Sequence, residues 1–143
     1  MKSAATVEPE KLEVKSENIL HLPLGLLGFE QHKKYVLLTH PEEAPFLWLQ
    51  MLEPPRQSFL VIPPAVAVPA YRPELSEEDV HFLGLQSPED ALVFNIVTLR
   101  RANEATVNLK GPIVINRHTL VAKQVIPLNA AGYALQHPLP AVS

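Results

Sequence analysis

The chain has 143 residues, of which 47% are hydrophobic, with 12 basic and 15 acidic residues for a formal net charge of −3. This is enough material for one domain with a core, and too little for two ordinary domains. The absence of cysteine excludes disulfides, thiolate nucleophiles and zinc sites with sulfur ligands, and it favours a reducing compartment. The charge balance gives no electrostatic footprint for binding nucleic acid, which needs clustered lysine and arginine, so we predict no direct nucleic-acid binding.

The N-terminal stretch 1–18 contains no apolar region of the kind found in a signal peptide. No apolar run reaches the roughly 20 residues of a membrane-spanning helix, so we expect a cytoplasmic protein without membrane contact. We expect a flexible tail at 1–11, one domain at 12–139, a short C-terminal tail at 140–143, and a monomer when the protein is free.

Most of the chain has the pattern of short strands. These are expected at 12–15, 19–22, 35–39, 46–52 and 59–62. An apolar turn around Gly25 and Gly28 is expected to pack inward. Both faces of 46–52 are apolar, which fits a strand that is covered on two sides or that borders a partner. The proline-rich segment 65–73 is expected to be extended and irregular.

One short helix is predicted after Ser76. Ser76 and Asp79 approximate a capping box, acids fill the first turn, and Val80 and Leu83 lie three residues apart before Gly84. The apolar stretch 91–99 that follows is typical of a strand buried on both faces. Asn95, in its middle, must find a hydrogen-bond partner or face outward.

The most strongly patterned stretch is 105–126, in which small or apolar residues alternate with polar ones. The apolar set is Val107, Leu109, Gly111, Ile113 and Ile115. Gly111 and Pro112 predict a bend or an edge position. After a turn at 116–118, where Asn116 can adopt a left-handed backbone, the run 119–126 is expected to pair back. We therefore predict a long, bent hairpin.

About eight or nine short, mostly antiparallel strands and one short helix together indicate an all-β fold, a small barrel or sandwich.

No arrangement of residues indicates catalysis. Six histidines are scattered singly, without the close spacing of a metal site, and surface or turn histidines are the commoner interpretation. The chain has no nucleophile elbow and no phosphate-binding glycine loop. We therefore predict no enzyme, no metal and no cofactor. A barrel that binds a small ligand or acts as an enzyme remains the alternative, which a fully packed interior would disfavour.

Three sets of residues are candidates for binding a partner. The acids Glu74, Glu77, Glu78 and Asp79 either complement a helix dipole or form a patch for a basic protein. The aromatic residues Phe46, Trp48 and Tyr71 are either core, the commoner case, or interface anchors. The outward positions of the predicted hairpin are Asn108, Lys110 and Asn116.

Several strings of residues, in one order along the chain, carry a resemblance. They are the P-x-G-L-x-G-F-E pattern at 23–30, the stretch 45–50, the residues Pro64, Pro69 and Tyr71, and 106–116 with 123–125. On these strings the sequence resembles the FliW family of bacterial flagellar assembly factors, from about residue 12 to 139. Four positions depart from the family pattern: Pro63 and Ala70 stand where acids are frequent, Ala122 stands for a usual glycine, and Leu27 stands for the proline of a G-L-P-G-F-E loop.

The resemblance implies a small β-barrel-like protein that binds flagellin in the cytoplasm and also binds the RNA-binding translational regulator CsrA. It implies partner exchange, in which export of flagellin frees the factor to bind CsrA and relieve repression of flagellin translation. Because an RNA-binding regulator presents basic surface, acids at 74–79 are expected to steer it.

Overall fold

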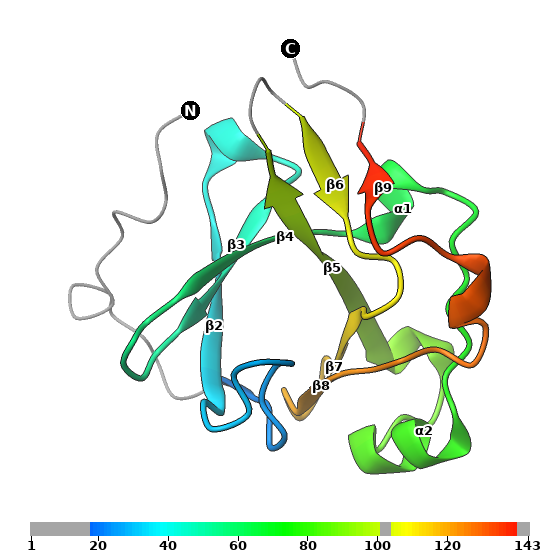
Figure 1. Cartoon of the computed structure of the whole chain (residues 1–143). Coiled ribbons are helices and arrows are strands. Elements are labelled where there is room, and N and C mark those ends of the chain that lie inside the picture. Colours follow the sequence, from blue (N-terminus) through cyan, green and yellow to red (C-terminus); the bar gives the residue numbers. More distant parts are fainter. Residues whose placement is uncertain (1–17, 101–103, 140–143) are drawn as a thin grey trace.

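Short antiparallel strands form the framework of the protein in this computed structural model, which describes residues 18–100 and 104–139 (Figure 1). Within these ranges there are nine strands: β1 (Leu20–His21), β2 (Lys34–Thr39), β3 (Leu47–Met51), β4 (Ser58–Ile62), β5 (Ala91–Leu99), β6 (Ala105–Val107), β7 (Ile113–Asn116), β8 (Ala122–Gln124) and β9 (His137–Pro138). Two helices, α1 (Pro64–Ala67) and α2 (Glu77–Leu83), accompany them, and short 3-10 turns lie at Pro41–Glu43, Pro88–Asp90 and Ala130–Gly132.

All the strand pairs in this sheet are antiparallel, in the order β1-β2-β3-β4-β5-β6-β9. The long strand β5 is the branch point. Its first half, Ala91 to Phe94, pairs with β7, and its second half, Val97 to Leu99, pairs with β6. β8 pairs with β7, and an isolated bridge between His21 and Val121 links this end to β1. The predicted all-β class is confirmed, as a curved sheet whose ladders do not close into a ring.

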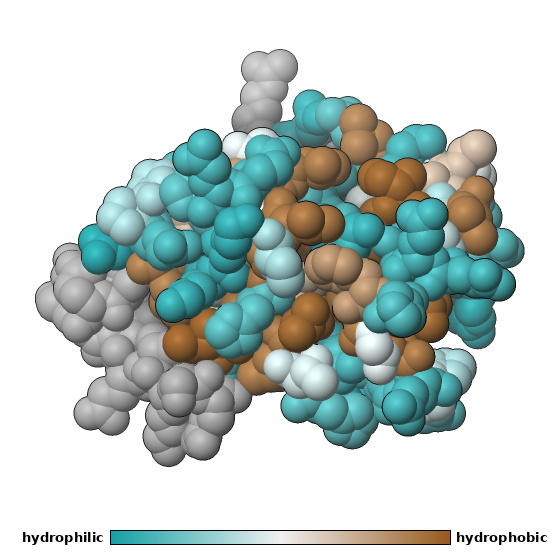
Figure 2. Space-filling model, turned by 90° about the horizontal axis from the view of Figure 1, so that it is seen from below, coloured by the Kyte–Doolittle hydropathy of each residue, from teal (hydrophilic) through white to brown (hydrophobic). Residues whose placement is uncertain are grey.

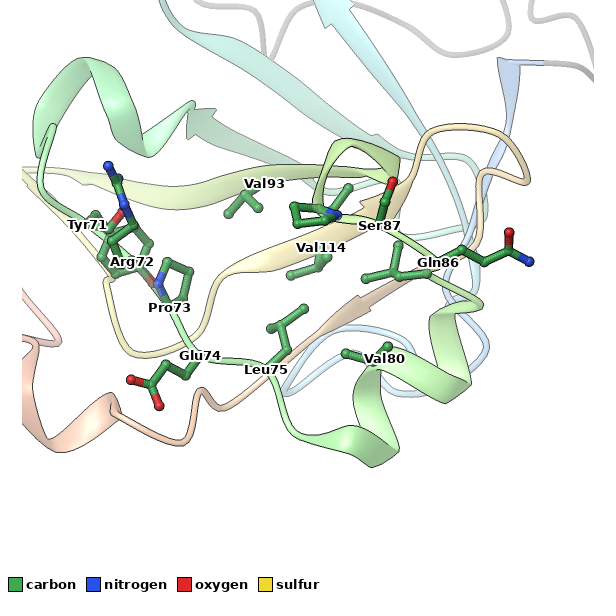
Figure 3. Close-up of a pocket in the computed structure, with 13 residues that line it drawn as sticks. Tyr71, Arg72, Pro73, Glu74, Leu75, Val80, Gln86, Ser87, Val93 and Val114 are labelled. Carbon is green, nitrogen blue, oxygen red and sulfur yellow. The ribbon is translucent and has the colours of Figure 1, made fainter.

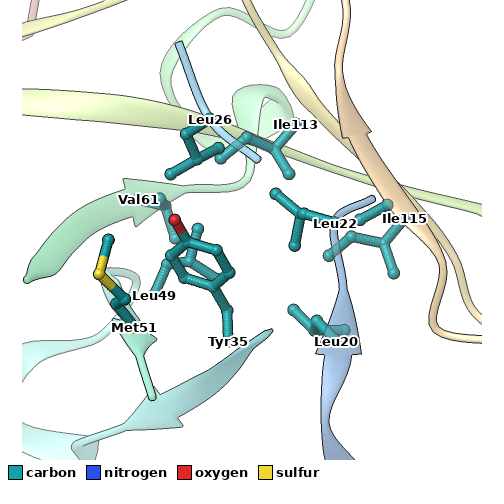
Figure 4. Close-up of a cluster of buried hydrophobic side chains, with 10 residues drawn as sticks. Leu20, Leu22, Leu26, Tyr35, Leu49, Met51, Val61, Ile113 and Ile115 are labelled. Atoms are coloured by element: carbon teal, nitrogen blue, oxygen red, sulfur yellow. The ribbon is translucent and has the colours of Figure 1, made fainter. Parts of the chain in front are cut away.

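The interior of the curved sheet is filled by apolar side chains. Its buried members include Leu20, Leu22, Leu26, Tyr35, Leu49, Met51, Val61, Ile113 and Ile115 (Figure 4). Tyr35 is fully buried, and its hydroxyl lies among these apolar groups. The apolar turn with Gly25 (φ +66°) and Gly28 (φ +89°) contributes Leu26 to this cluster, so its expected inward packing is confirmed.

Two further clusters lie on other faces of the same strands. One contains Trp48, Tyr71, Val97, Val107 and Leu109; the other contains Leu83, Val114 and Val125 beneath α2. β3 and β5 therefore contribute side chains to clusters on both faces, as their apolar sequences predict. Asn95 on β5 is fully buried and donates to the Asn108 carbonyl oxygen at 2.8 Å, so its expected partner exists.

The predicted hairpin over 105–126 is only half correct. Its second part, β7 with β8, is a hairpin, but β6 pairs with β5 and β9. The chain changes direction at Gly111–Pro112, so that Val107 and Leu109 enter one cluster while Ile113 and Ile115 enter another. At the β7–β8 turn the left-handed backbone belongs to Leu120 (φ 63°) and not to Asn116. The asparagine serves the turn through its side chain.

Other local differences are small. The segment expected to be irregular over 65–73 starts with the single-turn helix α1, which Pro64 opens because proline is accepted in a first helical turn. The strand expected over 19–22 is reduced to two residues. The tails expected at 1–11 and 140–143 and the strand expected at 12–15 lie outside the described residues.

Candidate functional site

Helix α2 has the ends that its sequence predicts. The Ser76 hydroxyl oxygen accepts the backbone N–H of Asp79 at 3.1 Å, which satisfies one free donor of the first turn. Gly84, with φ 68°, ends the helix, and its N–H donates to the His81 carbonyl oxygen at 3.0 Å. The helix packs against β8, so its position depends on the β7–β8 hairpin.

The four acidic candidates at this helix separate into two groups. Glu74, Glu77 and Glu78 are exposed, as a charged binding surface requires. Asp79 is 6% exposed and its carboxylate forms an ion pair with the Lys123 ammonium of β8, which also lies 5.3 Å from the centre of the Phe82 ring. Asp79 therefore anchors α2 to the sheet, and the surface patch consists of the other three acids.

The aromatic candidates belong to the core. Trp48 is 8% exposed and donates its indole N–H to Glu43, Tyr71 is 5% exposed, and Phe46 is half-buried against the same cluster. The Tyr71 hydroxyl donates to the Leu109 carbonyl oxygen at 2.6 Å, and burial raises its pKa. The core interpretation is thus confirmed for Trp48 and Tyr71.

The three polar candidates of the predicted hairpin do not point freely outward. Asn108 is half-buried, and its side-chain oxygen accepts the Lys110 N–H at 2.9 Å. Lys110 is half-buried too, and its ammonium donates to the Ala130 carbonyl oxygen at 3.1 Å. Asn116 is 3% exposed, so its predicted outward orientation is wrong.

Asn116 connects the hairpin to the helix. Its amide group donates to the Leu83 carbonyl oxygen at 2.8 Å, at the end of α2. Its side-chain oxygen accepts the N–H groups of His118 at 2.9 Å and Thr119 at 3.2 Å, within the β7–β8 turn. One buried side chain therefore satisfies backbone groups in both elements.

An open groove of about 570 Å³ lies between the segment 71–75, α2 with the following loop 85–88, and the strands β5 and β7 (Figure 3). Val93 and Val114 form its floor, and Leu75 and Val80 stand beside them. The side chains of Glu74 and Gln86 point outward at opposite ends. The groove is therefore apolar at its base, with polar groups at its rim.

The C-terminal segment holds the 71–75 wall of this groove in place. Asn129 accepts the Glu74 N–H at 2.9 Å and donates to the Arg72 carbonyl oxygen at 2.9 Å. The Tyr133 ring packs edge-on against Tyr71 with centroids 4.6 Å apart, and its hydroxyl accepts the Arg72 N–H at 3.0 Å. These contacts fix a wall that has no regular secondary structure of its own.

The other side of the groove is fixed by Asp90. Its carboxylate accepts the N–H groups of Gln86 and Ser87 at 2.9 and 3.0 Å and lies 3.0 Å from the His118 ring. The two backbone donors, followed by His118, lower the pKa of Asp90. Asp90 is therefore ionised at neutral pH, and its carboxylate fixes the backbone of the 85–88 loop.

Exposed apolar residues gather on the face formed by the 22–30 turn, β8 and α2, which Figure 2 shows with brown side chains between polar margins. Five large exposed apolar residues of the described chain lie in these elements or directly after β8: Leu24, Leu27, Phe82, Ile126 and Leu128. The Leu27 N–H donates to the Gln124 side chain of β8 at 3.0 Å, and the Leu128 N–H donates to the Glu74 carbonyl oxygen at 2.7 Å, so the 22–30 turn lies against β8 and the 126–128 segment lies against the groove wall. We call these five residues the apolar strip; it reaches the groove at Glu74.

Among residues 18–100 and 104–139, no group of three or more His, Cys, Asp or Glu side chains is arranged to hold a metal ion. In the same ranges no helix is long and apolar enough to cross a membrane.

Comparison with known proteins assigns the chain to a family. The family model described as FliW protein matches residues 3–139. The chain belongs to the FliW family. The flagellar assembly factor FliW of Leptospira interrogans serogroup Icterohaemorrhagiae serovar copenhageni (strain Fiocruz L1-130) is 39% identical over 121 residues, covering 83% of this chain and 81% of that protein. That of Natranaerobius thermophilus is 35% identical over 131 residues, covering 90% and 86%.

A solved crystal structure of the flagellar assembly factor FliW has the same fold. It superposes with a TM-score of 0.81 and 32% sequence identity, covering 90% of each chain. The resemblance seen in the sequence strings is therefore confirmed over nearly the whole chain. The FliW relatives are described as assembly factors and not as enzymes.

Sequence reasoning missed most of the groove and the apolar strip. Val93 and Val114 belong to predicted strands, but the pattern does not reveal that α2 leaves part of their face uncovered. The strip offered a signal at 126–128, where Ile126 and Leu128 flank a proline beyond the end of a strand. Apolar residues in such a loop are either buried or available to a partner.

Proposed function

We propose that this FliW-family protein is a cytoplasmic binding module that takes flagellin and the translational regulator CsrA as alternating protein partners. While flagellin accumulates, it occupies the protein; when flagellin is exported, the freed protein binds CsrA and relieves its repression of flagellin translation. Family membership supports a role in flagellar assembly, and the surface features below support the two partners.

The apolar strip is the observation that carries the proposal. Leu27, Ile126 and Leu128 are 64%, 59% and 68% exposed, although each could be buried at a gain of about 1.5–3 kcal/mol. Exposed apolar side chains that gather on one face of a protein are typical of protein interaction surfaces. A protein waiting for a partner keeps such a surface, whereas a purely structural domain has no use for it.

The acids beside the strip support the choice of a basic regulator. Glu74, before α2, and Glu77 and Glu78, in its first turn, are exposed, and Lys123 on β8 is already paired with Asp79. A protein whose ligand is RNA presents lysine and arginine at its binding surface. Opposite charges accelerate association and orient the encounter.

The competing proposal is a small-ligand site. The groove has a volume within the range of about 300–1,000 Å³ that is usual for such sites. It lies outside the curved sheet, whose own interior is filled by apolar side chains. A small ligand would leave the apolar strip without a role, and this favours the protein partners.

The test is a binding competition with three purified proteins: this protein, flagellin and CsrA. We expect it to bind each of them, and we expect an excess of flagellin to release CsrA. If the protein failed to bind flagellin, or failed to bind CsrA, the proposal of two alternating partners would be refuted.

A charge-reversal pair tests the role of the acids. Glu77→Lys on α2 should lower the association rate with CsrA and flatten its salt dependence, since it removes attraction at the surface. Glu42→Lys, at an exposed position in the 3-10 turn far from α2 in Figure 1, is the matched control and should change the rate much less. Equal effects of the two substitutions would count against steering by the patch.

A further inference from the structure

We propose that Gln124 of β8 is a positioning residue, which holds the 22–30 turn so that Leu27 stands out as an apolar anchor for a protein partner. This inference rests on the proposed function, because Leu27 belongs to the apolar strip that carries it. It assigns to one polar side chain the task of placing part of that strip.

The 22–30 turn separates inward from outward leucines. Leu22 and Leu26 are buried in the interior cluster (Figure 4), whereas Leu24 and Leu27 are 52% and 64% exposed. The Gly25 N–H donates to the Leu22 carbonyl oxygen at 2.8 Å and closes the base of the turn. The turn therefore has a fixed base and presents its outer leucines to solvent.

Gln124 joins the tip of this turn to a second segment. Its side-chain oxygen accepts the Leu27 N–H at 3.0 Å, and its amide group donates to the Gly111 carbonyl oxygen at 3.1 Å. The neighbouring Lys123 pairs with Asp79 of α2, because successive side chains of a strand point to opposite faces. Gln124 therefore uses one acceptor and one donor to tie the turn to the bend at 108–112.

The bend at 108–112 has room for this amide because residue 111 is glycine. A Cβ on Gly111 would lie 3.1 Å from Gln124 Nε2 and 3.3 Å from Asn108 Nδ2, which is tighter than ordinary side-chain contact. Gly111 does not have a positive φ, so space and not backbone conformation favours glycine here. The local sequence thus leaves the space in which Gln124 reaches the backbone.

The residue type at position 27 makes the link particular to this chain. The G-L-P-G-F-E loop pattern of the family has proline there, and proline has no N–H to donate. Leu27 supplies both the N–H that binds Gln124 and an exposed apolar side chain. A chain that follows the family pattern lacks this bond.

The bond matters for binding because it holds the anchor in place before a partner arrives. Gln124 keeps Leu27 against the strand that leads directly to Ile126, a second exposed member of the apolar strip. A turn that is already held loses little conformational freedom on binding. Loss of the bond would free the tip of the turn and leave the buried leucines in the interior.

Hydrogen exchange measures the positioning directly. Gln124→Met removes both polar groups, and Gln136→Met, exposed directly before β9 and far from the 22–30 turn in Figure 1, is the matched control. We expect the exchange rate of the Leu27 N–H to rise at least about fivefold in Gln124→Met and to stay unchanged in the control. Gln124→Glu keeps an acceptor for this N–H, so it should retain part of the protection.

Calorimetry with flagellin and with CsrA tests the consequence for binding. Leu27→Ala keeps the N–H and removes the anchor, and Leu135→Ala, at a leucine that is 57% exposed, is its control. We expect Leu27→Ala and Gln124→Met each to weaken binding of the same partner at least about fivefold. The double variant should bind little more weakly than either single variant, because Gln124 acts through Leu27. Thermal unfolding verifies that each variant is folded.

The outcomes separate this proposal from the proposed function. If the Leu27 N–H exchanges equally in the unchanged protein and in Gln124→Met, or if both affinities are unchanged in that variant, Gln124 positions nothing that a partner uses and the proposal is refuted. Additive effects of the two substitutions refute it too, since Gln124 would then act independently of Leu27. If Leu27→Ala binds flagellin and CsrA like the unchanged protein, the anchor is wrong and the proposed function stands. If the unchanged protein binds neither partner, both proposals fail together.

Discussion

Replacing Asn116 by alanine tests the idea that one buried side chain couples the β7–β8 hairpin to helix α2. The substitution removes the amide that donates to Leu83 and the oxygen that accepts from His118 and Thr119. The change leaves the backbone bonds of Asn116 to Val121 and Leu120 in place. It therefore isolates the side-chain contribution.

The expected cost follows from the burial of the groups that lose their partners. The contact with Leu83 is buried, and those with His118 and Thr119 are half-buried. An unsatisfied buried group costs about 1–3 kcal/mol, and the partly exposed donors recover part of theirs from water. We expect Asn116→Ala to lower the free energy of unfolding by about 3 kcal/mol. Asn108→Ala, which loses one half-buried bond to the Lys110 N–H, should cost only about 1 kcal/mol.

Urea unfolding followed by circular dichroism measures both variants. The midpoint should fall with an unchanged slope if only native-state bonds are lost. For a chain of this size, about 3 kcal/mol corresponds to a fall in Tm of roughly 10 °C. A loss below about 1 kcal/mol for Asn116→Ala, or equal losses for the two asparagines, would refute the coupling argument.

Three further predictions concern a glycine turn, a buried ion pair and a buried tyrosine. A Cβ at Gly25 would collide with the Phe29 carbonyl oxygen and lie 2.7 Å from Glu30 Cα, so Gly25→Ala should lower the free energy of unfolding by more than about 2 kcal/mol. A Cβ at Gly28 would meet open space, so Gly28→Ala should lower it by about 1 kcal/mol. Urea unfolding measures both variants. Lys123→Met leaves the buried Asp79 carboxylate unpaired and should cost about 2–3 kcal/mol, part of which Asp79→Asn in the same chain should restore. Burial, followed by the nearby Glu53 charge, raises the pKa of Tyr35 to about 12, so its stabilising effect is complete below the ordinary tyrosine pKa of about 10 and is lost as pH rises through about 12. The Tyr35 hydroxyl finds no hydrogen-bond partner among the described residues. The Tyr35→Phe variant should therefore be no less stable than the unchanged protein at neutral pH and should lose less stability at alkaline pH. A steeper loss of stability at alkaline pH would contradict this.

The strands and the helix follow from local signals that the sequence states plainly. A run of apolar, β-branched residues identifies β7, and Ser76 with Gly84 marks both ends of α2. The apolar continuity of 91–99 indicates a strand with neighbours on both faces. Its role as the branch point, paired with β7 at one end and β6 at the other, could not be predicted, because pairing depends on contacts between distant segments.

The candidate site could be predicted only in part, and the reason is geometric. Exposure of Glu74, Glu77 and Glu78 follows from their position at a helix start, but Asp79 and Asn116 have the same polar character and are buried. Their burial depends on Lys123 and Leu83, which lie 44 and 33 residues away in the chain. A pattern of polar residues therefore cannot separate surface groups from those that join two elements.

The hairpin and the binding face are joined by these two buried links. Lys123 of β8 holds the first turn of α2 through Asp79, and Asn116 of β7 holds its last residue through Leu83. Because α2 forms one wall of the groove and carries Glu77 and Glu78, the hairpin fixes where the charges stand relative to the apolar floor. A weakened link would allow the helix to shift and would widen the groove without changing any lining residue. Variants at Asn116 or Lys123 that remain folded should then bind a protein partner more weakly, because α2 and its acids are misplaced.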